Sequence, residues 1–206
     1  AIDKKRIISE VFGGRLAKPI ESPIISLEGD VSLNLPETET ASATIAKFKK
    51  INGDFSLNLI VPKIDFLEKT AEIIKQNWEA AGAKEVNVVS LSPEDIFENV
   101  IKTNNYEILL FGNVLEKPKD LFSFWHSSGR FYPGRNLALY KNQKADGLIE
   151  KIRQSGDKEE QEDLLKELRA IIIKDVPAAF LYTLSYAYIY DPKLQGFKIQ
   201  KMISSP

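Results

Sequence analysis

The sequence predicts an α/β fold with a parallel β-sheet at its core, and two observations in residues 55–112 carry this prediction. Runs with the alternating period of a β-strand are interleaved there with runs that have the amphipathic helical period of about 3.6 residues. Each helical run also begins with a recognisable start signal. A strand–helix–strand–helix–strand order at this spacing implies parallel strands joined by right-handed crossovers.

Three strands are predicted in this region, at residues 55–61, 86–89 and 106–111. The first alternates Phe, Leu, Leu and Val with Ser, Asn and Ile, and the second is rich in valine. The third is almost wholly apolar, which is typical of a strand covered on both faces. We therefore expect helices on both faces of the sheet.

Two helices are predicted between these strands. The first starts at Asp65 and Glu68, which have the spacing of a capping box, and ends at Gly82. The second starts at Ser92, with Pro93 in its first helical position. The residues expected on the buried faces are Leu67, Ala71, Ile74, Trp78 and Ala81 in the first helix and Ile96, Phe97, Val100 and Ile101 in the second.

Five further helices and one further strand are predicted outside this region. The helices lie at residues 3–12, 45–50, 120–125, 143–155 and 157–176. The strand covers residues 180–190, where aromatic side chains occupy alternate positions and favour sheet packing over a binding site. We expect one α/β lobe over residues 1–206, with a long strand near its end.

Composition and charge exclude several classes of function. The 206 residues carry 28 lysines and arginines against 29 acidic residues, and the formal net charge of −1 argues against a non-specific nucleic-acid binder. No apolar run approaches the roughly 20 residues of a membrane-spanning helix. The lack of cysteine excludes thiol catalysis, thiolate metal sites and disulfides.

The side chains that most catalytic sites need are scarce. The single histidine, His126, is followed by Ser127 and Ser128, and this adjacency is a poor geometry for a catalytic triad. The sequence has no G-x-S-x-G motif, and the Gly-Gly-Arg at residues 13–15 lacks the spacing of a phosphate loop. Carboxylates are too scattered to suggest a metal site. We therefore expect a binding protein without catalytic activity, cofactor or metal.

A long irregular segment, residues 113–141, is the predicted location of the functional site. It leaves the carboxyl end of the third predicted strand, where open α/β sheets bind their ligands. It mixes aromatic with hydrogen-bonding side chains, as ligand pockets and interfaces do. Alternatively, Phe122, Phe124 and Trp125 cover the edge of the sheet, and for Trp125 the two roles are equally open.

Four segments together resemble one known family. They are residues 1–14, the Asp-Leu-Phe-Ser-Phe-Trp-His-Ser-Ser run at 120–128, the stretch from Asn136 through Tyr140 and Asn142 to Asp146, and residues 175–182 with Gly196 and Phe197. Their order and spacing are similar to those in the carboxyl-terminal lobe of the extracytoplasmic solute-binding proteins of oligopeptide and dipeptide ABC transporters. The resemblance covers nearly the whole chain.

This resemblance implies one of two lobes that close on a small solute or peptide and deliver it to ABC permease subunits. The amino-terminal lobe would be missing, as the abrupt chain ends also suggest, and the parent protein would be extracytoplasmic and lipid-anchored. The candidate ligand-binding residues are Phe111, Asn113, Val114, Glu116, Trp125, His126, Asn136 and Tyr140. The alternative is an independent α/β enzyme or an interaction domain of similar fold.

One position departs from the pattern of the family. Peptide-binding members carry an aspartate after the third strand that pairs with the α-amino group of the ligand, and Val114 occupies that position here. A buried ammonium group without a partner would be strongly disfavoured. Three outcomes stay open: the ligand lacks a free α-amine, Glu116 replaces the aspartate, or both residues only shape the loop.

Overall fold

In the computed structural model the chain folds into two compact units. The structure describes residues 2–24, 41–113, 121–185, 191 and 193. The first unit comprises residues 1–14 and 26–113, and the second comprises residues 15–25 and 114–206. The expectation of a single α/β lobe over residues 1–206 stays a prediction.

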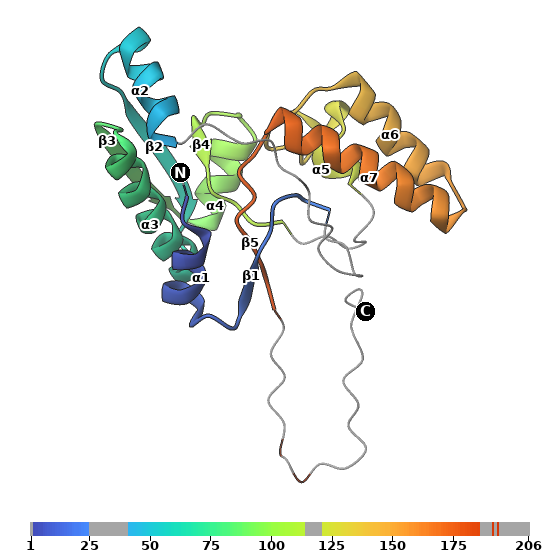
Figure 1. The fold of residues 1–206 in the computed structure, drawn as a ribbon, viewed down its shortest axis with the longest axis horizontal. Helices are drawn as coiled ribbons and strands as arrows, with labels where there is room; N and C mark the ends of the chain where they lie inside the picture. Colours follow the sequence, from blue (N-terminus) through green and yellow to red (C-terminus); the bar gives the residue numbers. More distant parts are fainter. Residues whose placement is uncertain (1, 25–40, 114–120, 186–190, 192, 194–206) are drawn as a thin grey trace. The chain divides into compact units, whose positions relative to one another are not determined.

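A three-stranded parallel sheet forms the centre of the first unit (Figure 1). Its strands are β2 (Ser56–Pro62), β3 (Glu85–Leu91) and β4 (Ile108–Leu109), in the order β3-β2-β4. The strand β2 pairs in parallel with both neighbours, and Leu59 lies opposite Val88 of β3. The predicted β-α-β-α-β unit with parallel strands is confirmed.

The strand β4 is shorter than the strand predicted at residues 106–111. Just before it, the carboxylate of Glu107 accepts hydrogen bonds from the backbone N–H and the side-chain amide of Asn58, at 2.9 and 3.0 Å. A side chain thus takes the place of a backbone acceptor beside β2, and the ladder to β4 begins one residue later, at Leu59.

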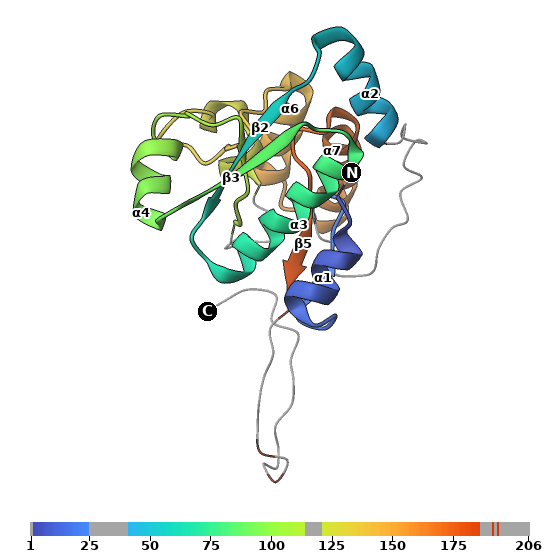
Figure 2. The same ribbon diagram turned by 90° about the vertical axis from the view of Figure 1, so that its left-hand side faces the viewer.

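The helix α3 (Asp65–Ala81) packs across β2 and β3 (Figure 2). Leu67, Ala71 and Ile74 of the predicted stripe are buried. The helix ends at Gly82, as predicted, with a φ of +121° that side-chain-bearing residues rarely adopt.

The predicted capping box at the start of α3 is wrong. Ile64 occupies the N-cap position, and no side chain caps the helix there. Asp65 lies inside the helix and accepts a hydrogen bond from Lys69 at 2.8 Å, while Glu68 accepts one from Ser90 in β3 at 2.6 Å. The chain enters the helix so soon after β2 that the cap falls on Ile64, and the two acids stabilise the first turn through the helix dipole instead.

The connection from β3 to β4 begins as predicted and then widens into a π-helix. The hydroxyl of Ser92 accepts a hydrogen bond from the N–H of Asp95 and caps the short helix α4 (Pro93–Asp95), which continues as η1 (Ile96–Ile101). The prediction that Phe97 is buried is wrong, because 43% of it is exposed. The wider i→i+5 turns of η1 change which positions face inward.

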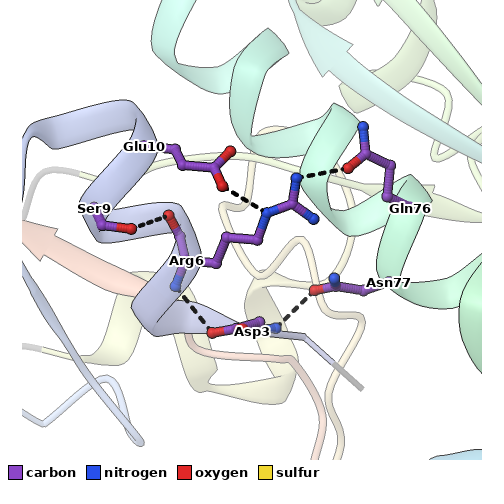
Figure 3. A network of polar contacts seen from close by, with 6 residues as sticks. All are labelled: Asp3, Arg6, Ser9, Glu10, Gln76 and Asn77. Atoms are coloured by element: carbon purple, nitrogen blue, oxygen red, sulfur yellow. Dashed lines mark hydrogen bonds and ion pairs between the residues drawn. The ribbon is translucent and has the colours of Figure 1, made fainter.

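Polar contacts fix the helix α1 (Lys4–Phe12) on α3 (Figure 3). The carboxylate of Asp3 caps α1, and the N–H of Asp3 donates to Asn77 at 2.7 Å. The guanidinium of Arg6 donates to Gln76 at 2.8 Å. The helix predicted at residues 3–12 is confirmed.

The helix α2 (Ala41–Asn52) extends the short helix predicted at residues 45–50 in both directions. Its Phe48 packs edge-on against Phe55, with ring centroids 4.8 Å apart. This contact joins α2 to the residue that precedes β2.

Two short strands pair antiparallel in the second unit. They are β1 (Ala17–Pro19) and β5 (Tyr182–Leu184), which form a sheet of their own. Residues 182–184 belong to the long strand predicted at residues 180–190, of which residues 186–190 lie outside the described residues. Within the described residues, the pairing partner of residues 182–184 is β1.

A pair of helices carries the core of the second unit. The helices α6 (Gln143–Gln154) and α7 (Lys158–Asp175) pack against each other and follow the short helix α5 (Phe122–Trp125), as predicted. Asn142 caps α6 by accepting two backbone N–H groups, and Asp157 caps α7 by accepting the N–H of Glu160. The buried core cluster comprises Leu121, Trp125, Tyr140, Ala145, Leu148, Ile149, Ile152, Leu165, Leu168 and Ile172.

We expect Leu168→Ala to lower the free energy of unfolding by about 2–5 kcal/mol, because Leu168 is fully buried and its truncation leaves a cavity. Leu164→Ala, on the same helix but only partly buried, is the matched control and should cost less. Chemical denaturation followed by circular dichroism measures both losses. Equal losses would contradict the orientation of α7 in this core.

Candidate functional site

The order of the strands defines where the first unit can bind a ligand. The chain leaves β2 for β3 through α3, and then crosses to the opposite side of β2 through α4 and η1. Figure 1 shows α3 on one side of the sheet and α4 on the other. Open α/β sheets bind ligands beyond the carboxyl ends of their strands, at the point where the strand order reverses. That point lies at the carboxyl ends of β2 and β4.

Four exposed residues follow these two strand ends. Lys63 and Ile64 come after β2, and Phe111 and Asn113 come after β4. Ile64 is 39% and Phe111 40% exposed, so both offer apolar surface to solvent. One edge of the sheet thus presents four different groups, namely an aromatic ring, an aliphatic side chain, an ammonium group and an amide. This carboxyl edge is the candidate site.

Phe111 and Asn113 are among the site residues predicted from the sequence, whereas Lys63 and Ile64 are not. Lys63 and Ile64 come shortly after the strand predicted at residues 55–61. Because open α/β sheets bind ligands beyond the carboxyl ends of their strands, the end of this strand could have pointed to them. The ammonium of Lys63 has no ion-pair partner among the residues that the structure describes, and it is therefore available to an anionic group of a ligand.

The other six predicted site residues belong to the second unit. Val114 and Glu116 lie outside the described residues, so the question of the α-amine stays a prediction. The structure places the remaining four, which are Trp125, His126, Asn136 and Tyr140.

Trp125 lies in the core of the second unit. It is 8% exposed, and its ring centroid lies 6.3 Å from that of Tyr140 and 5.4 Å from that of Phe180. Of the two roles that the sequence leaves open, this burial favours packing.

Asn136 holds the loop between α5 and α6 in one conformation. It is 1% exposed, and its amide donates to the carbonyl oxygens of His126 and Tyr140 at 3.1 and 2.9 Å. Its side-chain oxygen accepts from the N–H of Tyr140 at 3.0 Å. Burying an amide without hydrogen bonds costs free energy, so these three contacts favour this one conformation of the loop.

The hydroxyl of Tyr140 ties the same loop to the end of α7. It donates to Asp175 at 2.6 Å, and the amide of Asn142 donates to the same oxygen at 2.7 Å. Burial, assisted by the bond to Asp175, raises the pKa of Tyr140 well above its ordinary value. The hydrogen bonds from Tyr140 and Asn142 lower the pKa of Asp175. At neutral pH the pair is therefore a neutral phenol that donates to a carboxylate.

His126 is engaged on both sides of its ring. It stacks on Phe122 with centroids 4.2 Å apart, and its Nε2 lies 3.3 Å from Glu150. Its Nδ1 accepts the N–H of Ser128 at 3.1 Å, and the hydroxyl of Ser128 lies 2.8 Å from the same nitrogen. Because this bond occupies the Nδ1 lone pair, the ring is poorly placed to take a proton from Ser128.

A cavity of about 520 Å³ lies elsewhere in the first unit, between α1, α3 and β3. Its lining holds no aromatic side chain, and Arg6 and Glu10 in its wall pair with each other at 2.8 Å. The carboxyl edge has the more suitable chemistry for a ligand, with an exposed aromatic ring and an unpaired cation.

The described part of the chain offers neither a metal-ion site nor a membrane-spanning helix. No group of three or more histidine, aspartate or glutamate side chains within it could hold a metal ion. No helix in that part is long and apolar enough to cross a membrane.

The fold is shared with the solute-binding proteins of peptide-type ABC transporters, which confirms the resemblance expected from the sequence. The oligopeptide-binding protein AppA of Bacillus subtilis (strain 168) is 25% identical over 217 residues. That match covers 96% of this chain and 39% of the relative, so the chain spans about two fifths of the relative's length. No family model matches the sequence.

Solved structures show the same similarity. The structure of AppA from Bacillus subtilis in complex with a nonapeptide has a TM-score of 0.76 at 23% identity, covering 88% of this chain and 39% of that one. The periplasmic binding protein DppA from Helicobacter pylori, in complex with the peptide STSA, has a TM-score of 0.75 at 18% identity, covering 89% and 37%.

We expect the stability of the protein to fall in acid partly through Asp175. A carboxylate whose pKa is lowered by folding contributes stability above its unfolded pKa of about 3.9, and this contribution is lost as the pH falls through the folded value. Asp175→Asn should therefore flatten the dependence of unfolding free energy on pH below about pH 5, where the unfolded carboxylate begins to bind protons before the folded one does, as measured by urea denaturation.

Tyr140→Phe removes one of the two hydrogen bonds to this carboxylate and should flatten the same dependence in part. An unchanged pH dependence in both variants would refute the role given to the pair.

Proposed function

We propose that the chain is the carboxyl-terminal lobe of a two-lobe solute-binding protein that binds peptides and delivers them to the permease of an ABC transporter. The similarity to an oligopeptide-binding protein over 96% of this chain supports the proposal. The observation that carries it is the exposed group of Lys63, Ile64, Phe111 and Asn113 at the carboxyl edge of the sheet. We further propose an extracytoplasmic location and a lipid anchor on the whole protein.

The four residues suit the chemistry of a peptide. The amide of Asn113 can donate to a peptide carbonyl and accept from a peptide N–H. Phe111 and Ile64 can cover an apolar side chain, and Lys63 can pair with a carboxylate such as that of the peptide terminus. None of these contacts encloses the ligand, because all four residues are exposed. A second lobe would supply the enclosure.

In the full-length protein we expect Phe111→Ala to weaken the binding of a mixed oligopeptide pool by about tenfold, since the variant removes the aromatic surface of the site. Phe97→Ala removes a comparably exposed phenylalanine from η1 and is the matched control, with no expected change. Isothermal calorimetry gives both dissociation constants. Failure of the full-length protein to bind any peptide would refute the proposed function.

The isolated chain should bind the same pool about a thousandfold more weakly than the full-length protein, because one lobe leaves most of the ligand in water. The two titrations are run side by side under identical conditions. Equal affinities would show that the site is complete within this chain and that no second lobe closes on it.

A further inference from the structure

A compact loop in the second unit presents two aromatic side chains to solvent. Phe131 is 62% and Tyr132 50% exposed. Both belong to residues 130–135, here called the aromatic loop, whose ends are joined by a hydrogen bond of 3.0 Å from the N–H of Asn136 to the carbonyl of Gly129. Exposed aromatic side chains of this kind are enriched at binding surfaces.

The aromatic loop is held rigidly. The N–H of Gly134 donates to the carbonyl of Phe131 at 2.8 Å, which closes a turn within the loop. The backbone of Gly134 lies so close to that of Gly129 that a β-carbon at position 134 would clash with it. The buried amide of Asn136 fixes the residue that follows the loop. A surface that is ordered before binding loses little conformational entropy when a partner binds.

The aromatic loop lies in a stretch of sequence that is rich in cationic residues. Residues 127–145 contain four cationic residues and no acidic residue. One of the four, Lys144, pairs with Glu167 at 2.7 Å, and Asp146, which follows the stretch, accepts the backbone N–H of Ser127 at 2.8 Å. Two of these cations, Arg130 and Arg135, flank the aromatic pair within the loop. The guanidinium of Arg130 lies 5.4 Å from the centre of the Phe131 ring and donates through Nε to the carbonyl of Ser127 at 3.1 Å.

Arg135 is exposed and has no ion pair within the part of the chain that the structure describes. Guanidinium groups bind carboxylates through paired hydrogen bonds, and their stacking on aromatic rings leaves the N–H edges free to do so. The fitting partner is therefore a side-chain carboxylate next to an apolar or aromatic residue.

We propose that the aromatic loop binds acidic segments of peptides, and that the protein consequently prefers peptides containing glutamate or aspartate. The inference rests on the proposed peptide-binding function and adds a preference to it. Arg130 and Arg135 bind the carboxylate, and Phe131 and Tyr132 cover the neighbouring apolar side chain.

The test compares matched peptides that differ only in one central residue, glutamate or glutamine, beside a leucine. Both peptides are amidated at the carboxyl terminus, so that a terminal carboxylate cannot contribute. Calorimetry with the full-length protein should show about tenfold tighter binding of the glutamate peptide at low salt, with the difference shrinking as the ionic strength rises.

The double variant Arg130→Gln/Arg135→Gln should abolish this preference, so that it binds the glutamate and glutamine peptides with equal affinity. Lys158→Gln, which removes an exposed cation at the start of α7, is the matched control and should keep the preference. Gly134→Ala, which disturbs the closure of the loop without changing its charge, should weaken the preference as well.

Equal binding of the two peptides by the wild-type protein, or a preference that survives in the double variant, would overturn the inference and leave the proposed function intact. If neither peptide binds and a mixed oligopeptide pool does not bind either, the proposed function fails and the inference fails with it.

Discussion

The first unit depends on the parallel pairing of β2 with a strand on each of its edges. Parallel neighbours cannot be joined by a tight turn, so the chain must cross over twice, through α3 and through α4 with η1. Because the two crossovers lead to opposite sides of β2, they lie on opposite faces of the sheet. The same topology brings the carboxyl ends of β2 and β4 together, and this is why Lys63 and Phe111 belong to one edge.

The second unit depends instead on buried polar groups that are fully bonded. Asn136 makes three hydrogen bonds in a site that is 1% exposed, and Tyr140 is joined to Asp175 at the end of α7. A low-dielectric environment makes such bonds stronger and makes their loss costly. These residues therefore give the loop between α5 and α6 a single conformation. In this way they position the exposed side chains of the aromatic loop.

The two units offer different chemistry to a ligand. The carboxyl edge of the first unit combines apolar surface with an amide and a single cation, which suits the backbone and one end of a peptide. The aromatic loop of the second unit combines two rings with two guanidinium groups, which suits acidic side chains.

The sequence by itself determined the features that depend on neighbours a few residues apart. Gly82 ends α3 and the apolar periods give the parallel β-α-β-α-β order, as predicted, and Asp3 and Asp157 cap helices that begin next to them in sequence. Tertiary structure decided the rest. The length of β4 depends on the reach of Glu107 to a distant strand, and the burial of Trp125 depends on rings remote in sequence. Local periodicity contains no information on which distant groups meet, because those contacts form only when whole elements pack.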